Sequence, residues 1–324
     1  MRLGTITAVL FGVAATLPAA AQTDASAWPS KQTIRLVSPF PAGSSLDTIA
    51  RPVFEEVGRR LGQGYIVENR PGAGGTIGMA AVAKAEPDGY TLLINSSVHT
   101  ITPSTYSNLR YDTVRDFAGI APLAQFPNVL VVPPQRYKTI AEMVEFGRGK
   151  PGALTYGSGG VGAATHLNAE RLLLSAGVKA VHVPFKGAPE ALREVIGDRI
   201  DFYFSPLASA LPVIEGKEVR ALAVSGLKRT PALPDVPTTL EAGFPNSDYT
   251  FWIGVFAPAA TPRAIIDRLS AEIARAKTEP SVTQAFARQG AEAMSLTPVE
   301  YDQFVRAEID SNAAVARAAG IKSN

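Results

Sequence analysis

The chain has 324 residues, of which 46% are hydrophobic and 19% charged, with a formal net charge of +2 and no cysteine. This length allows one large or two ordinary domains at about 150 residues each, and the composition favours a folded core over disorder. The small net charge argues against a nucleic-acid partner, and the lack of cysteine excludes disulfides, thiolate metal sites and a cysteine nucleophile. Since the histidines, His99, His166 and His182, are widely spaced, we expect no metal site.

Residues 1–21 have the features of a secretory signal peptide. Arg2 precedes an apolar run over 3–17, and small residues follow through Ala21. The run is too short to span a bilayer, and small residues before the cleavage point are what a signal peptidase recognises. We therefore predict an exported protein, outside the cytoplasm, whose mature chain begins near Gln22.

The segment 34–51 predicts a strand, a sharp turn and the start of a helix. Two prolines end the strand, and Gly43 tolerates backbone angles that other residues avoid. Ser44 or Ser45 then offers an N-cap oxygen before apolar residues at helical spacing. A helix N-terminus placed there presents free amides and a partial positive charge, which favours an anion such as a carboxylate or phosphate.

Strands and helices alternate after this unit. We expect strands over 65–68 and 90–94 with a short helix over 76–85 between them, an order typical of a mainly parallel α/β sheet. Pro52 lies inside the first helix and removes the hydrogen bond to the carbonyl of Thr48, so we predict a kink there.

A second alternating set begins at the apolar strand 128–132. Its Gly-rich unit, 154–167, repeats the arrangement of the first loop, with a short strand, glycines and a hydroxyl, and then a helix. Two such helix N-termini, one from each of two domains, could face each other across a cleft. That arrangement would hold an anion from both sides.

The chain ends with a strand over 250–256 and three helices, the last opened by a capping box from Thr297 to Glu300. Because these helices need a sheet to cover, we expect the chain to leave the first domain and return to it, so that two crossings form a hinge. The predicted domains are a discontinuous first domain, 30–125 plus 250–324, and a second domain, 126–249.

The segment 157–162 also matches the dinucleotide-binding pattern G-x-G-x-x-G between a strand and a helix. The acidic residue expected about 20 positions later is missing, since the strand 180–184 ends without Asp or Glu. We therefore expect no nucleotide and no other cofactor.

A secreted serine hydrolase that uses Ser158 is the alternative from another class. Ser158 lies on a strand-to-helix elbow and His166 is close in sequence, but Tyr156 occupies the position where the elbow requires glycine. A hydrolase with paired carboxylates would need two acids at the cleft, and only Asp47 lies on a candidate loop. We expect a binding protein and not an enzyme.

Similarity to a known family is carried by several runs, at 38–47, 67–78, 156–167, 183–187 and 221–238. In this order they resemble the Bug receptors, the periplasmic solute-binding proteins of tripartite tricarboxylate transporters. The resemblance implies a two-domain Venus-flytrap fold, similar to type II, with mainly parallel sheets flanked by helices. It also implies a small organic acid ligand and delivery of that acid to an inner-membrane permease, and we expect a monomer.

The resemblance further implies which residues hold the ligand carboxylate through amides, hydroxyls and ordered water. The expected site comprises Phe40, Gly43, Ser44, Ser45, Asp47, Ser96, Ser97, Ser158, Gly159, Gly162, Ala163, Thr165 and Ser205. Relatives often have Ser or Thr in place of Ala163, and many have Asp or Asn in place of Ser205. Ser205 therefore argues against an amino acid and favours a simple or aromatic mono- or dicarboxylate. Lys186 could neutralise a second carboxylate, although we expect a solvated surface lysine.

Overall fold

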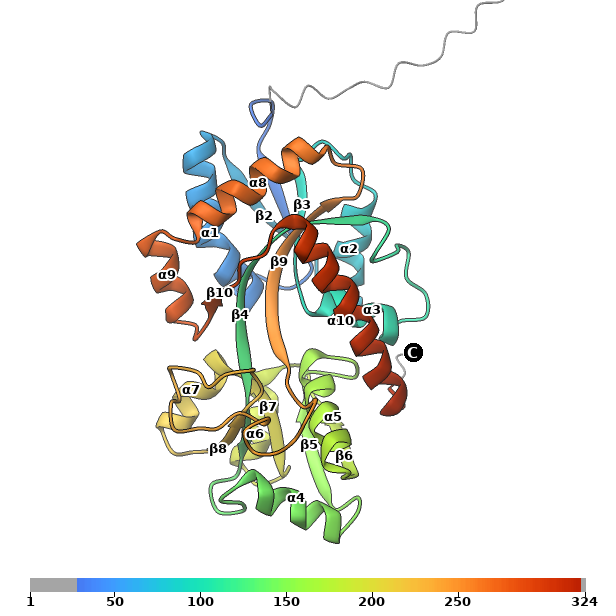
Figure 1. Ribbon diagram of the computed structural model, residues 1–324, viewed down its shortest axis with the longest axis vertical. Coiled ribbons are helices and arrows are strands. Elements are labelled where there is room, and N and C mark those ends of the chain that lie inside the picture. Colours follow the sequence, from blue (N-terminus) through green and yellow to red (C-terminus); the bar gives the residue numbers. More distant parts are fainter. Residues whose placement is uncertain (1–27, 322–324) are drawn as a thin grey trace, which may run out of the picture.

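The computed structural model describes residues 28–321, so the predicted signal peptide at 1–21 lies outside the described residues. The elements form two lobes, one above the other, with helices on the faces of a curled sheet (Figure 1). This arrangement confirms the predicted α/β class. Within the described range, no helix has both the length and the apolar character needed to cross a membrane.

The upper lobe combines segments from both ends of the chain. Strand β1 lies between β2 and β3 in parallel register, and helices cover both faces. Its elements are β1 (Ile34–Ser38), α1 (Ser45–Leu61), β2 (Tyr65–Asn69), the 3-10 turn η1 (Ala73–Gly75), α2 (Thr76–Ala83), β3 (Thr91–Ser96), α3 (Val98–Thr105), α8 (Arg263–Ala276), α9 (Pro280–Ala287), β10 (Glu292–Ala293) and α10 (Pro298–Ala318).

The lower lobe is built from one continuous stretch of chain. Strand β5 lies between β6 and β7 and is parallel to both. Its elements are α4 (Ile140–Gly149), β5 (Leu154–Ser158), α5 (Ala164–Ala176), β6 (Ala180–Pro184), α6 (Ala188–Ile196), β7 (Phe202–Pro206), α7 (Leu207–Glu215) and β8 (Arg220–Val224).

Two strands connect the lobes, β4 (Phe117–Val132) and β9 (Thr250–Pro258), and they pair with each other antiparallel (Figure 1). The later part of β4 pairs with β7 and β8, while β9 pairs with β3, also antiparallel. The sequence predicted only 128–132 of β4, because Pro122 and Pro127 argue against a strand. Register shifts beside Pro122 accommodate the first proline within the ladder.

Two helices of the upper lobe, α1 and α10, begin where the sequence predicts. Thr297 and Glu300 form the predicted capping box of α10. Helix α1 is a single helix of 17 residues with Pro52 inside it. The kink at Pro52 stays a prediction. The buried face of α1, which includes Ile49 and Val53, packs in the same core as Leu269 of α8.

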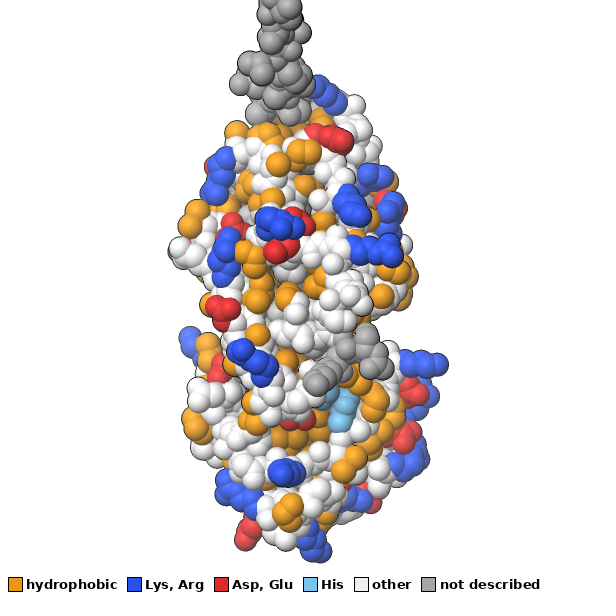
Figure 2. Space-filling model, turned by 90° about the vertical axis from the view of Figure 1, so that its right-hand side faces the viewer, with side chains coloured by type: hydrophobic (Ala, Val, Ile, Leu, Met, Phe, Trp, Pro, Cys, Tyr) orange, Lys and Arg blue, Asp and Glu red, His pale blue; other side chains and the backbone are white. Residues whose placement is uncertain are grey.

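The surface has charges of both signs on the face that Figure 2 displays, spread over the two lobes and the waist between them. This mixture agrees with the small net charge of +2. Helix α10 extends from the upper lobe along the side of the waist to α5 (Figure 1), where Arg171 Nη2 donates to Ser311 Oγ at 2.9 Å and to Asn312 Oδ1 at 3.1 Å. The lobes are therefore in contact beside the crossing strands.

Candidate ligand-binding site

A cavity of about 640 Å³ lies between the two lobes and has walls from both of them. This volume is typical of a small-molecule site. The predicted site residues that line it are Phe40, Gly43, Ser44, Ser45, Ser96, Gly159, Ala163 and Thr165. The structure thus brings together the two loops that the sequence placed more than a hundred residues apart.

Five helices begin at the wall of this cavity. The residues that line it at their first turns are Ser44 and Ser45 for α1, Ser96 and Val98 for α3, Ala163 to Thr165 for α5, Gly187 to Pro189 for α6, and Pro206 and Ala208 for α7. Each helix N-terminus presents free amides and a partial positive charge. None of the described lining residues has a charged side chain, so the positive potential comes from the backbone.

The first loop is held by Asp47, which does not itself line the cavity. Its Oδ2 accepts from the Gly43 amide at 3.0 Å, and its Oδ1 lies 2.9 Å from Arg51 Nη2. Burial opposes ionisation of Asp47, but the Arg51 guanidinium and the Gly43 amide outweigh it, so the pKa of this carboxyl is lowered. Asp47 therefore remains an anion that is already paired and that fixes the loop.

Ser44 occupies the N-cap position of α1 as predicted, but its hydroxyl makes no capping bond. The Ser44 Oγ is buried and has no hydrogen-bond partner within residues 28–321. A buried hydroxyl without a partner is costly, and ligand binding would remove that cost. Ser44 also lines the cavity, so rotating this hydroxyl toward a ligand oxygen would break no hydrogen bond in the described chain.

The second loop is organised by its own side chains. The Gly159 amide donates to Thr165 Oγ1 at 2.9 Å, the Gly160 amide donates to Ser158 Oγ at 3.0 Å, and the Gly162 amide donates to His166 Nδ1 at 3.0 Å. These bonds engage three loop amides inside the protein. The amides available to a ligand are consequently those at the first turn of α5, beside Ala163.

Ser158 contacts a histidine that the sequence patterns did not connect with it. Its Oγ lies 2.6 Å from His182 Nε2, and the His182 ring stacks on His166 with 3.8 Å between centroids. Burial lowers the pKa of His182 to about 4, and burial together with the neighbouring His182 lowers that of His166 to about 3, so both rings are neutral at pH 7. The pairing of β5 with β6 places Tyr156 opposite His182, which brings the His182 ring close to Ser158. The sequence did not predict this strand register, so it did not predict the contact between Ser158 and His182.

Five of the expected site residues lie behind the cavity wall and do not line it: Asp47, Ser97, Ser158, Gly162 and Ser205. Ser97 Oγ accepts from Tyr249 OH at 2.8 Å, and Ser205 Oγ donates to the Pro206 carbonyl at 3.2 Å. Ser158 is fully buried, with its hydroxyl committed to the loop and to His182. Their polar groups serve protein contacts, and this role could not be read from residue type alone.

Aromatic residues line the cavity at positions that the sequence patterns did not single out. Phe126 of β4 and Phe251 of β9 lie opposite each other in the crossing strands, with ring centroids 4.9 Å apart. Tyr203 of β7 contributes from the lower lobe, and Gln289, which follows α9, contributes a neutral polar side chain. Long-range strand pairing creates the Phe126–Phe251 pair, so local sequence patterns do not reveal it.

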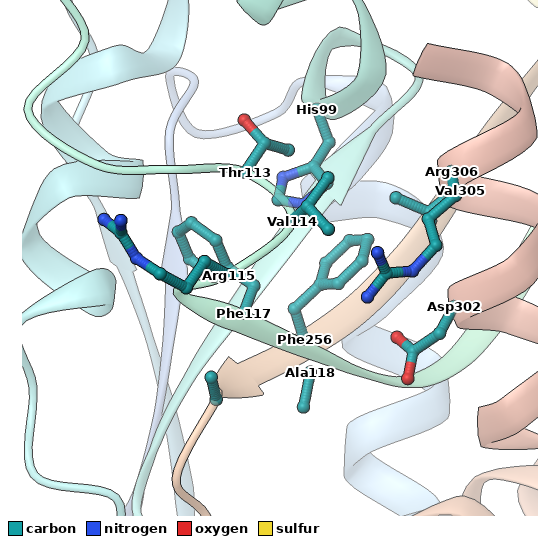
Figure 3. Close-up of a pocket in the computed structure, with 11 residues that line it drawn as sticks. His99, Thr113, Val114, Arg115, Phe117, Ala118, Phe256, Asp302, Val305 and Arg306 are labelled. Atoms are coloured by element: carbon teal, nitrogen blue, oxygen red, sulfur yellow. The ribbon is translucent and has the colours of Figure 1, made fainter. Parts of the chain in front are cut away.

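A second, smaller cavity of about 120 Å³ lies within the upper lobe, between α10, β9 and the residues that precede β4 (Figure 3). His99 and Phe256 line it, and the His99 ring stacks on Phe256 with 4.1 Å between centroids. His99 Nε2 and Thr113 Oγ1 have no hydrogen-bond partner in the described chain. The space fits a few water molecules at about 30 Å³ each. It contains none of the predicted site residues.

Known proteins resemble this chain in both sequence and structure. A family model described as "Tripartite tricarboxylate transporter family receptor" matches residues 49–321. The "UPF0065 protein in tcbD-tcbE intergenic region" of Pseudomonas sp. (strain P51) is 40% identical over 266 residues, which are 82% of this chain and 79% of the relative.

Two solved structures share the fold over nearly their whole length. "R. palustris Rpa4515 with adipate" has a TM-score of 0.81 at 32% identity, over 92% of this chain and all of its own. "MatC (Rpa3494) from Rhodopseudomonas palustris with bound malate" has a TM-score of 0.77 at 31% identity, over 88% of this chain and 99% of its own.

Proposed function

Because this chain belongs to the receptor family of tripartite tricarboxylate transporters, we propose that it captures a small organic carboxylate between its lobes and delivers it to an inner-membrane permease. The family membership confirms the resemblance carried by the sequence runs. It also confirms the periplasmic binding protein fold. The proposed function includes export by the segment 1–21 and a periplasmic location.

The convergence of five helix N-termini on one uncharged cavity is the observation that carries this proposal. Free amides and aligned peptide dipoles stabilise an anion without adding a charged side chain that would itself need desolvation. The two related structures were solved with adipate and with malate, which are both carboxylates. A carboxylate is therefore the anion that we assign to this site.

The proposed mechanism is closure by differential affinity. Residues 30–125 plus 250–324 act as one body and residues 126–249 as the other, and they rotate about β4 and β9. A ligand held by α1 from above and α5 from below makes both sets of contacts only when the lobes are close. It therefore binds the closed state more tightly and shifts the population toward it.

A calorimetric titration of the purified mature protein tests this function. A panel of carboxylic acids, each compared with its uncharged primary amide, separates recognition of the anion from nonspecific binding. We expect at least one acid to bind and its amide to bind at least about a hundredfold more weakly, since the primary amide lacks the charge that the backbone amides solvate. Equal affinity of acid and amide would contradict the proposal.

The hydrolase alternative makes a different prediction, because an enzyme would convert an ester substrate repeatedly, whereas a receptor would only bind its ligand until all sites are occupied. Ser158 and His182 are close enough to resemble a nucleophile and its base, yet Ser158 is fully buried and off the cavity wall. We propose that the chain is not an enzyme. Steady hydrolysis of p-nitrophenyl acetate that disappears in Ser158→Ala would support the alternative instead.

A further inference from the structure

The lining of the cavity combines helix N-termini with aromatic side chains. Phe40 lies on the upper lobe, Tyr203 on the lower lobe, and the Phe126–Phe251 pair on the crossing strands between them. The remaining apolar lining includes Leu46 and Val98. A ligand that enters this space would therefore meet helix N-termini at some of its atoms and carbon surfaces at the rest.

We propose that the preferred ligand is an aromatic acid with a single carboxylate, whose ring packs against the Phe126–Phe251 pair. This inference rests on the proposed function, because it assumes that the cavity is the carboxylate site. The carboxylate lies at the first turns of α1 and α5, where Ser44 Oγ has no protein partner in residues 28–321. The ring then occupies the apolar part of the space.

The Phe126–Phe251 pair is suited to hold a ring because of where the strands place it. The two residues are directly opposite in the antiparallel ladder, so both side chains extend from the same face. Their rings are 4.9 Å apart and inclined by 37°. A third ring can continue such a cluster in an offset or edge-to-face arrangement, which an aliphatic chain cannot match.

A second carboxylate would have to use another helix start, and the first turn of α6 contains Pro189, which has no N–H to donate. No described lining residue is cationic, and Lys186 is exposed and does not line the space. The backbone amide of Lys186 donates to Glu190 Oε2 at 2.9 Å, which fixes this turn beside α6. A second charge would have to lose its water against phenyl rings, at a high cost in free energy. The neutral carboxamide of Gln289 suits an uncharged polar substituent better.

Four acids test separately the two parts of this inference, the single carboxylate and the aromatic ring. Benzoate and terephthalate have the same ring and differ by one carboxylate. Cyclohexanecarboxylate has the charge of benzoate without its aromaticity, and adipate is an aliphatic dicarboxylate. Dissociation constants from calorimetry with the wild-type mature protein should place benzoate at least about tenfold tighter than terephthalate and adipate. Benzoate should also bind at least about threefold tighter than cyclohexanecarboxylate.

The variant Phe251→Leu tests the role of the ring pair. It should weaken benzoate by about three- to tenfold and change the affinity for cyclohexanecarboxylate by less than about twofold. Phe146→Leu is the matched control, because Phe146 packs against Tyr137 in the lower lobe and does not line the cavity. That control should leave both acids unchanged, and urea unfolding of each variant verifies that it folds.

The possible failures are distinguishable. Adipate or terephthalate binding tighter than benzoate would overturn the single-carboxylate inference and leave the proposed function intact. Equal affinities for benzoate and cyclohexanecarboxylate would overturn the role of the ring. If neither these four acids nor any acid of the wider calorimetric panel binds to the folded protein, the proposed function fails together with the inference.

Discussion

Gly162, in the loop before α5, packs against Thr105 at the end of α3, so a binding loop of the lower lobe touches a helix of the upper lobe. A Cβ atom added at Gly162 would lie 2.9 Å from both Cβ and Cγ2 of Thr105. The glycine also has a φ of 72°, in the left-handed region that favours glycine. The contact therefore depends on glycine for two separate reasons.

Gly162→Ala should destabilise the protein by about 1–2 kcal/mol and weaken ligand binding, because the new methyl group keeps the lobes apart. Gly177→Ala is the matched control, since Gly177 has a φ of 63° but open space around its position. Urea unfolding and calorimetry on both variants separate backbone strain from the contact between lobes. Equal losses of affinity in the two variants would show that the Thr105 contact does not matter.

Ser44→Ala should weaken binding of the carboxylate about tenfold or more, the usual loss for a hydrogen bond to a charged group. Its unfolding free energy should stay within about 0.5 kcal/mol of wild type, because the hydroxyl makes no bond in the protein. Calorimetry with a bound acid measures the first effect, and urea unfolding measures the second.

Ser158→Ala is the contrasting variant. The Ser158 hydroxyl accepts from the Gly160 amide and contacts His182, so its loss should cost at least about 1 kcal/mol of stability. The assignment of Ser44 to the ligand would fail if Ser44→Ala lost stability but not affinity.

Acid should destabilise the protein through His99. Burial lowers the pKa of His99 from 6.5 to about 3, so between these values the unfolded chain binds a proton that the folded chain does not. The stabilisation is complete above pH 6.5 and is lost as the pH falls toward 3, by up to about 1.4 kcal/mol per pH unit. Urea unfolding at pH 7, 6 and 5 gives the unfolding free energy as a function of pH, and we expect it to fall less steeply with acid in His99→Gln than in the wild type. The same pH dependence in both proteins would contradict this assignment.

The N-cap of α5 is open to improvement. Ala163 occupies this position with an extended backbone and makes no capping bond. Ala163→Thr supplies an oxygen acceptor and should raise the unfolding free energy by about 1 kcal/mol. Ala163→Val has the same shape without the oxygen, so thermal unfolding of the pair isolates the cap. Equal melting temperatures of the Thr and Val variants would mean that the first-turn amides of α5 do not donate to the side chain of residue 163.

Local signals in the sequence were sufficient for the starts of α1, α5 and α10, but they did not predict α3 (Val98–Thr105). The turns before α1 and α5 lie where glycine, proline and serine place them, and the capping box at Thr297 forms as expected. The α/β class follows from the alternation of strand and helix patterns, which depends only on neighbouring residues.

Contacts across the sheet were beyond those signals. Phe126 meets Phe251 through pairing between segments more than a hundred residues apart, and His182 reaches Ser158 from the adjacent strand. Which serine is free and which is engaged also depends on such neighbours. Ser44 and Ser158 look alike in the sequence, yet only the Oγ of Ser44 lacks a partner in the described chain.

The long return of the chain also affects the order of folding. Leu93 in β3 pairs with Phe256 in β9, whereas β5, β6 and β7 pair within a short span of chain. Loop-closure entropy makes the distant pairing slower to form, so the lower lobe should acquire protection from hydrogen exchange before the upper sheet does. A chain emerging amino end first would therefore present an unpaired edge on β3 until β9, near the start of the last quarter of the sequence, has emerged.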